Sequence, residues 1–149
     1  MRMILSAHEI KKRFEASASS DQIVLSPYQL ESQQPASYDL TCATDTILLS
    51  GKVTLVPSTE WIELPHDLAA TLMCRSTLGR QGVLIGAGFV DPGFRGNLTL
   101  CLVNCGEKDI FLGAGMRIVQ IIFHEVRNNT TLYNGTYQDS HGVVQAVKK

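Results

Sequence analysis

One carboxylate stands in a setting suited to chemistry, within the segment GAGFVDPGFRGNLTLCLVN at positions 86–104. Asp91 lies directly before a Pro-Gly turn, with apolar Phe89 and Val90 on its other side. Aspartate before Pro-Gly is also a common start of a plain turn. Beside a bound ligand, however, a carboxylate could order a water molecule as a general base or hold metal-bound waters. The same segment places a thiol, Cys101, on an expected strand.

A second segment, MCRSTLGRQG at positions 73–82, has the residue types that bind phosphate. A glycine lets the backbone approach a ligand, hydroxyl and amide groups can surround oxyanions, and guanidinium groups match phosphate geometry. Arginine and serine in a loop also occur in plain solvated turns, but the short distance to Asp91 in the sequence favours a shared site. The residues concerned are Arg75, Ser76, Thr77, Gly79 and Arg80.

A side-chain amide interrupts a third segment, GAGMRIVQIIF at positions 113–123, whose apolar residues alternate as in a strand. Gln120 must find hydrogen-bond partners, either in the core or in a ligand. For Arg117 in the same segment we expect a structural hydrogen-bonding role.

These groups need a framework, and the sequence predicts one made of short strands. Ser6-Ala7-His8-Glu9 reads as a capping box, which predicts one helix over about residues 6–15. After it, short β-rich runs alternate with turn residues and leave little room for further helices. This pattern is typical of an antiparallel sandwich or barrel, and we predict a single jelly-roll-like domain over residues 1–149. The expected strands are QIVLS, TILLS, KVTLV, EWIEL, AATLMC, GVLI, NLTLCLVN, DIFL and RIVQIIFHEV.

The polar segment at positions 128–149 has no core pattern. It could be a frayed terminus, or it could be a mobile arm that closes over a ligand. Tyr133 and Tyr137 favour the arm, because aromatic side chains are costly in a tail that contacts nothing.

The composition excludes several classes of function. The 149 residues carry a net charge of -1, which argues against a grip on nucleic acid, since a polyanion requires a concentrated basic face. The longest apolar runs are shorter than the roughly 20 residues that span a bilayer. The N-terminal segment becomes charged too early for a secretory signal, so we expect a cytoplasmic protein without a membrane partner.

The four cysteines show no metal-binding pattern. They form no CxxC pair, and the four histidines do not cluster near them, which argues against a zinc site. Their even number would allow disulfides, but without an export signal we expect reduced thiols.

Several segments, taken together and in this order, resemble the dUTPase and dCTP deaminase superfamily. They are ASYDLTCATD, CRSTLGRQG, GAGFVDPGFRGNLTL, GMRIVQIIF and YNGTYQDSHG, and MILSAHEIKKRF also resembles the start of dCTP deaminases. The resemblance covers nearly the whole chain. It implies a distorted jelly-roll of the β-clip type that assembles as a homotrimer, with deoxynucleotide sites between subunits and Mg2+ on the triphosphate.

The resemblance also implies roles for single residues. Asp91 would meet the deoxyribose 3'-hydroxyl and, in members that hydrolyse dUTP, orient the attacking water. Phe94 would pack on the sugar, and Gln120 would contribute to the nucleotide site. The phosphate-binding motif would comprise Arg75, Ser76, Thr77, Gly79 and Arg80, with Ser76 and Arg80 acting in catalysis beside Asp91. The backbone of Thr99, Leu100 and Cys101 would read the edge of the pyrimidine.

Asp39, in SYDL, matches a family aspartate near the metal and phosphates. A plain turn residue is an equally good interpretation of Asp39. No residue of the chain is expected to bind Mg2+ directly, because the substrate phosphates would hold it.

One departure from the family decides the predicted reaction. Family members that deaminate dCTP carry a glutamate ten residues after the aspartate, where this chain has Cys101. A thiol, with an ordinary pKa of about 8.5, is mostly protonated at neutral pH and does not replace a carboxylate that shuttles protons. We therefore predict a Mg2+-dependent dUTP diphosphatase, which converts dUTP to dUMP and pyrophosphate. The alternatives are a nucleotide-binding paralogue without turnover and, ranked last, a dCTP deaminase.

A second departure concerns the C-terminal segment. The deaminase-like pattern has a lysine and a glutamine that grip the terminal phosphates, where this chain has Thr136 and Ser140. Tyr133 and Gly135 match the pattern. The loss of a cation and a long amide should weaken the hold on the β- and γ-phosphates.

Overall fold

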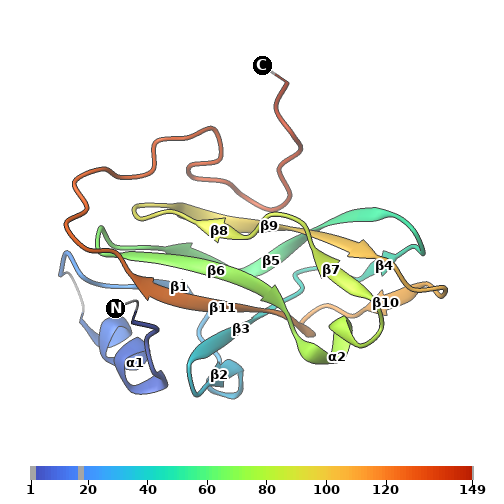
Figure 1. Ribbon diagram of the computed structural model, residues 1–149, viewed down its shortest axis with the longest axis horizontal. Helices are drawn as coiled ribbons and strands as arrows, with labels where there is room; N and C mark the ends of the chain where they lie inside the picture. The colour runs from blue at the N-terminus through green and yellow to red at the C-terminus, as the bar shows by residue number, and fades with distance from the viewer. Residues whose placement is uncertain (1–2, 17–18, 149) are drawn as a thin grey trace.

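The computed structural model describes residues 3–16 and 19–148, and most of its regular structure is β. A four-stranded sheet in the order β1-β5-β9-β7 packs against a five-stranded sheet in the order β2-β3-β11-β6-β8, and β10 pairs with β4 beside them (Figure 1). The predicted all-β jelly-roll domain with a short N-terminal helix is confirmed. The elements are α1 (Ala7–Glu15), β1 (Val24–Ser26), η1 (Leu30–Ser32), β2 (Gln33–Gln34), β3 (Ser37–Thr41), β4 (Thr46–Leu48), β5 (Val53–Glu63), β6 (Leu68–Cys74), α2 (Ser76–Gly79), β7 (Val83–Ile85), β8 (Phe89–Val90), β9 (Arg95–Asn104), β10 (Ile110–Leu112) and β11 (Arg117–Glu125).

The single long helix forms where its cap predicts. The Ser6 side chain accepts a hydrogen bond from the Glu9 backbone N–H, which satisfies one of the free donors at the start of α1. Ile10 on the inner face of α1 is fully buried. The helix is therefore anchored to the sheets by its apolar face.

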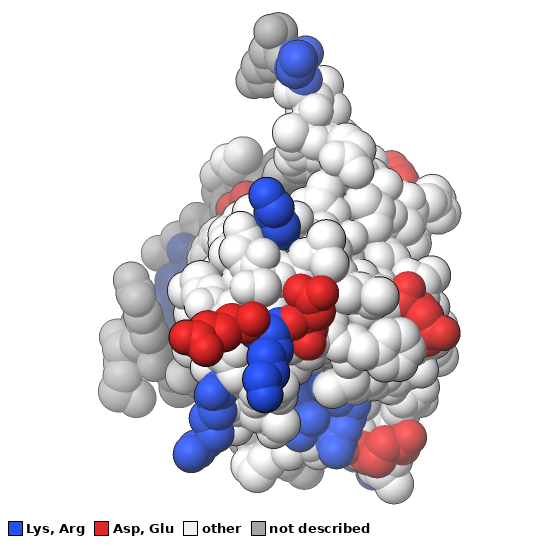
Figure 2. All heavy atoms as spheres, turned by 90° about the vertical axis from the view of Figure 1, so that its right-hand side faces the viewer, with Lys and Arg blue, Asp and Glu red and all other residues white. Residues whose placement is uncertain are grey.

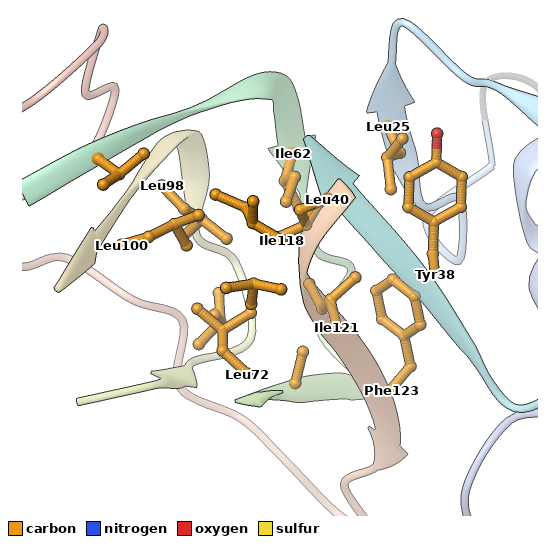
Figure 3. Close-up of a cluster of buried hydrophobic side chains, with 14 of the residues drawn as sticks. Leu25, Tyr38, Leu40, Ile62, Leu72, Leu98, Leu100, Ile118, Ile121 and Phe123 are labelled. Carbon is orange, nitrogen blue, oxygen red and sulfur yellow. The ribbon is translucent and has the colours of Figure 1, made fainter. Parts of the chain in front are cut away.

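Alternation of burial along the strands builds the core. In β9 every second residue from Gly96 to Asn104 is buried, while the residues between them face outward. Figure 3 shows Leu98 and Leu100 of β9 gathered with Leu72 of β6 and Ile121 of β11. The inner faces of both sheets thus share one core, which holds the strands that carry the site.

Two predicted strands, KVTLV and EWIEL, form one strand, β5, with a bulge. The register against β9 shifts between Pro57 and Trp61, so residues 58–60 are not paired in the regular ladder. Proline has no backbone N–H for the ladder, which explains why regular pairing stops there. The bulge lies beside residues 97–99 of β9, whose register partners flank it on β5.

Charged residues form no large patch of one sign on the end of the molecule that carries β4 and β10. Figure 2 views this end and shows basic and acidic side chains interspersed among uncharged ones. Within the described residues, no helix has the length and apolar character needed to cross a membrane.

Candidate functional site

A cleft of about 400 Å3 opens between β9, the loop that precedes it and the C-terminal segment. This volume falls within the range of small-molecule sites. Most of the lining is apolar, with a few polar groups among the side chains. The lining residues are Leu55, Leu72, Ile85, Gly86, Ala87, Gly88, Phe89, Val90, Asp91, Phe94, Asn97, Leu98, Thr99, Cys101, Tyr133, Tyr137, Ser140, Val144, Gln145 and Ala146.

Strand β9 supplies one wall of the cleft. Because successive side chains alternate across a strand, Asn97, Thr99 and Cys101 point to the cleft, while Leu100 points into the core. The Cys101 carbonyl accepts a hydrogen bond from the Gly86 N–H at 2.8 Å, which joins β9 to the opposite lip. The segment predicted to read the base, residues 99–101, therefore lines the cleft with the side chains of Thr99 and Cys101.

The turn after Asp91 places a carboxylate and an aromatic ring together at the cleft. The Phe94 N–H donates to the Asp91 carbonyl at 3.2 Å. Phe94 is only 7% exposed, and the Tyr133 ring packs edge-on against its ring with 5.7 Å between the centroids. Gly93 has φ +82°, and a Cβ there would lie 2.8 Å from Leu132 Cβ, so only glycine fits this turn. Asp91 is exposed and free to meet a ligand.

The C-terminal segment forms the second wall. We name residues 133–146 the arm; it runs across β8 and β9 in Figure 1. The Tyr133 N–H donates to the Pro92 carbonyl at 2.7 Å, and the Asn97 N–H donates to the Ser140 carbonyl at 2.8 Å. The arm therefore covers its own chain's cleft, with Tyr133 and Ser140 facing it and Thr136 exposed outside its lining.

The predicted phosphate-binding residues lie elsewhere. They occupy α2 and its caps, which Figure 1 places at the opposite end of the molecule from the arm's start. Leu78 anchors this short helix in the core, and the four residues around it are exposed, with none lining the cleft. The exposed four are Ser76, Thr77, Gly79 and Arg80. Within one chain, the cation-rich half and the carboxylate half of the predicted site are separate.

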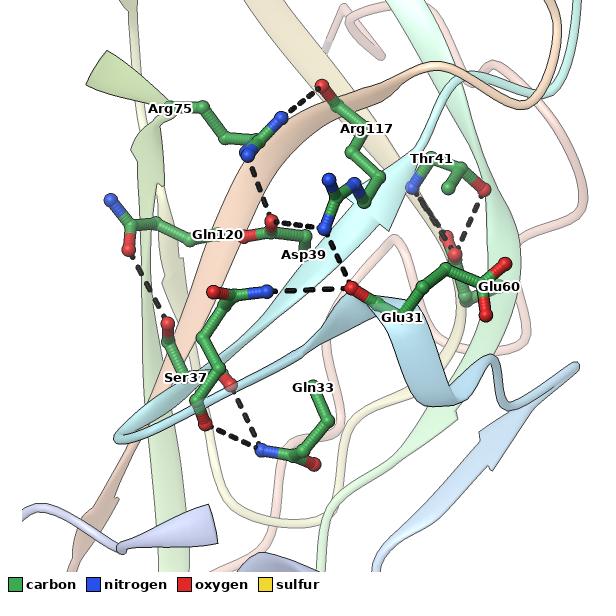
Figure 4. Close-up of polar contacts among 10 residues, drawn as sticks. Glu31, Gln33, Ser37, Asp39, Thr41, Glu60, Arg75, Arg117 and Gln120 are labelled. Carbon is green, nitrogen blue, oxygen red and sulfur yellow. Dashed lines mark hydrogen bonds and ion pairs between the residues drawn. The ribbon is translucent and has the colours of Figure 1, made fainter. Parts of the chain in front are cut away.

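A buried acid, Asp39, holds Arg75 and Arg117 in a third group, shown in Figure 4. The Asp39 Oδ2 atom lies 2.9 Å from Arg75 Nε and 3.6 Å from Arg117 Nη1, and Asp39 is only 2% exposed. Burial raises the pKa of Asp39, and the two guanidinium groups partly offset that shift. Gln120 pairs with Asp39 across β11 and β3 and accepts a hydrogen bond from the Ser37 hydroxyl at 3.3 Å.

This arrangement bears on the expected Mg2+. The Asp39 carboxylate is already occupied by Arg75 and Arg117, so it does not fit a metal ligand. Among the described residues, one cluster has the spacing of metal ligands, Asp21, His66 and Asp67, but Arg13 binds the Asp67 carboxylate at 2.6 Å. A magnesium ion at this site would have to be held by substrate phosphates.

Sequence reasoning missed several residues of the cleft lining, among them Asn97 and Val144. Asn97 occupies the same face of β9 as Thr99 and Cys101, and alternation along NLTLC could have found it. Val144 reaches Thr99 through a hydrogen bond from its backbone N–H to the Thr99 hydroxyl oxygen at 2.9 Å. No local pattern predicts this hydrogen bond between Val144 and Thr99, because the two residues are 45 apart in the chain.

The sequence matches one family model, described as dCTP deaminase-like, over residues 43–126. It is 32% identical to the dCTP deaminase of Thermococcus sibiricus over 163 aligned positions, which cover 99% of each chain. It is 37% identical to the dCTP deaminase of Pyrococcus abyssi, covering 83% of this chain and 90% of that one.

Solved structures of two kinds of enzyme share the fold. The 2'-deoxycytidine 5'-triphosphate deaminase of Agrobacterium tumefaciens superposes with a TM-score of 0.69 at 21% identity, covering 84% of this chain but 48% of that one. The native dUTPase of EIAV superposes with a TM-score of 0.64 at 20% identity, covering 78% and 99%.

These matches correct the predicted reaction. The prediction of a dUTP diphosphatase is wrong: the sequence relatives that match most of the chain are named dCTP deaminases, whereas the dUTPase is similar in fold alone. The prediction relied on elimination: a glutamate is missing at position 101, and its absence argues against the deaminating branch of the superfamily. Similarity along the whole chain outweighs that single position.

Proposed function

Because the chain belongs to the dCTP deaminase-like family, we propose that it is an enzyme that binds dCTP and converts it, with water, to dUTP and ammonia. The observation that carries this proposal is the cleft, which brings Asp91, Phe94, Thr99 and Cys101 together in a space suited to a nucleoside. The relatives' name supplies the substrate class.

The cleft suits a deoxynucleoside in its shape and polarity. We propose that the sugar packs on the Phe94 ring, with its 3'-hydroxyl donating to the Asp91 carboxylate, and that the pyrimidine lies along β9 beside Thr99 and Cys101. The buried aromatic ring leaves little space for an additional hydroxyl, which favours deoxyribose over ribose. The mostly apolar lining suits the faces of a base.

Deamination requires proton transfers at the base. Water adds to C4 of the cytosine ring, its proton passes to N3, and the amino group departs as ammonia, which leaves a carbonyl. Among the described residues that line the cleft, Asp91 carries the only carboxylate, so it is the group suited to accept a proton, which an ordered water would relay from C4 because Asp91 itself contacts the 3'-hydroxyl. Because the lining has the Cys101 thiol where a second carboxylate could share the proton transfers, we expect turnover to be slow.

The triphosphate requires the separate cation-rich motif. We propose that the chain assembles as a homotrimer in which Ser76 and Arg80 of one subunit bind the phosphates of a nucleotide held in a neighbour's cleft. The separation of the two halves within one chain supports this arrangement. Mg2+ held by the phosphate oxygens would neutralise part of their charge, since Asp39 is engaged with arginines.

The test is an assay of purified protein with dCTP and Mg2+, with nucleotides separated by chromatography and ammonia measured. We expect dUTP and ammonia in equal amounts, and a rate about 100-fold or more lower for Asp91→Asn. The control is Asp45→Asn, since Asp45 accepts the Ala114 N–H far from the cleft lining. Conversion of dUTP to dUMP without consumption of dCTP would contradict the proposal.

A further inference from the structure

Two of the contacts that hold the arm on β9 are made by one residue, Asn97. Asn97 Oδ1 accepts a hydrogen bond from the Gly142 N–H at 3.2 Å, and its backbone N–H donates to the Ser140 carbonyl at 2.8 Å. Two nearby points of the extended arm are therefore fixed by one residue of the strand. Asn97 itself lines the cleft.

The other end of the same side chain is fixed to the bulge of β5. Asn97 Nδ2 lies 3.0 Å from the Glu60 carbonyl, and the Ser58 and Thr59 carbonyls are 3.4 and 3.5 Å away. The bulge leaves these carbonyls without regular ladder partners from β9, and the asparagine NH2 shares its two N–H donors among them, while the Ser58 hydroxyl also donates to the Glu60 carbonyl. A carboxamide is required here, because it donates to the bulge and accepts from the arm at once.

Neighbouring contacts set the register of the arm. Arg95 binds Asp139 through two hydrogen bonds of 2.9 Å each, and His141 packs on Trp61 at 4.9 Å. Gly96 permits the close approach, since a Cβ there would lie 2.9 Å from both the N and O atoms of Ser140. Arg95 and Gly96 directly precede Asn97, and Trp61 is its register partner on β5.

The part of the arm after Gly142 forms a wall of the cleft. The Val144 N–H donates to Thr99 Oγ1 at 2.9 Å, and residues 144–146 line the cleft together with Cys101. We infer that Asn97 is a positioning residue that couples the β5 bulge to the arm and thereby sets the wall facing the base. This role for dCTP turnover rests on the proposed function, whereas the coupling itself does not.

Hydrogen exchange, measured by mass spectrometry without nucleotide, tests the coupling. In Asn97→Ala we expect the amides of residues 138–146 to exchange about tenfold faster, because the arm loses the side-chain hydrogen bonds that join it through Asn97 to the β5 bulge. The matched control is Asn104→Ala on the same strand. The Asn104 side chain also makes hydrogen bonds, to Leu48, Gly106 and Lys108, but none of these involves the arm.

A loss of protection confined to the arm in Asn97→Ala supports the inference. Equal protection of the arm in Asn97→Ala and the unaltered chain, or equal loosening in Asn104→Ala, overturns it. With dCTP, we expect Asn97→Ala to raise KM about tenfold with a smaller change in kcat, since the wall becomes disordered before binding. If dCTP is not converted, the proposed function fails while the exchange result still decides the coupling.

A second pair of variants covers the case in which Asn97→Ala does not fold. Arg95→Asp and Asp139→Arg should each speed exchange of the arm about twofold, because this pair is half exposed and modest in strength. The double variant restores the pairing with reversed charges and should restore protection. If the arm exchanges at the same rate in both single variants, the double variant and the unaltered chain, the Arg95–Asp139 pair does not set the register of the arm.

Discussion

A thiol faces the cleft where the proposed chemistry calls for a base. Cys101 lies on the wall of β9 together with Thr99, and its sulfur is 3.9 Å from the Thr99 carbonyl. Asp91, on the preceding turn, carries the only carboxylate of the lining among the described residues. At the scale of residues, the proposed enzyme has one carboxylate for two tasks. One task is to activate the attacking water, and the other is to protonate the ring.

Cys101→Glu should therefore raise the rate of dCTP deamination by about 100-fold, because it adds a carboxylate beside the proposed position of the pyrimidine. The measurement is kcat for ammonia release at neutral pH. Cys101→Gln is the matched control: it has the same length and no charge, and it should show no gain. A rate for Cys101→Glu no higher than that of Cys101→Gln would contradict this account of the cleft.

At the scale of elements, the bulge of β5 makes hydrogen bonds to β9, which forms one wall of the cleft. Within residues 58–60, Ser58 Oγ accepts the Leu98 N–H at 2.9 Å, and Glu60 turns into the space between the sheets. The fully buried Glu60 carboxylate accepts hydrogen bonds from the Thr41 backbone N–H and, at 2.9 Å, from the Thr41 hydroxyl (Figure 4). The bulge thus joins β3, β9 and the arm.

This buried acid gives the fold a pH dependence. Burial raises the pKa of Glu60 above its ordinary 4.5, so the native state binds the proton more tightly than the unfolded chain. The free energy of unfolding should fall as pH rises from about 4.5 through the raised pKa, and then level off. Glu60→Gln has no proton to lose and should show a flatter curve over this interval.

Denaturant unfolding at a series of pH values from about 4.5 to 7.5 measures this difference. Asp39, whose pKa burial also raises, contributes a slope of the same sign to both proteins, so the difference between the curves isolates Glu60. The control is Glu63→Gln on the same strand, where Glu63 accepts the Trp61 indole N–H. Parallel curves for Glu60→Gln and the unaltered chain would disprove the assignment.

Local patterns predicted the elements better than the contacts between them. The Ser6 cap and the alternation in NLTLCLVN predicted α1 and β9, because helix caps and period-two burial are encoded in neighbouring residues. The short strand β3 was not predicted, since all five of its residues are buried and no alternation marks it. The arm's docking depends on pairs such as Arg95 and Asp139, which no local pattern reveals.

At the scale of the whole molecule, the proposed nucleotide site is divided between two separate groups of residues. Asp91 lies in the cleft, Arg80 lies exposed at α2, and no described residue of that motif lines the cleft. A homotrimer in which neighbours share sites would bring the two halves together. Its mass would be three times the 16.3 kDa of one chain.

Mixed assemblies test this sharing. Asp91→Asn and Arg80→Ala should each lack activity alone, but subunits co-expressed in equal amounts should recover about a quarter of the full activity, because random mixing joins both intact residues at that share of sites. Sedimentation of each protein checks the assembly. No recovery in mixed trimers would place both residues in one chain's site and contradict the division.

The most direct test of the proposed reaction is a single-turnover experiment with the protein in excess over dCTP, in the presence of Mg2+. Excess protein makes even slow chemistry visible, because every nucleotide is bound and product release does not limit the signal. We expect each dCTP to yield one dUTP and one ammonia, with the rate lowered by Asp91→Asn. Bound dCTP that stays unchanged, while Asp91→Asn binds it equally well, would contradict the account.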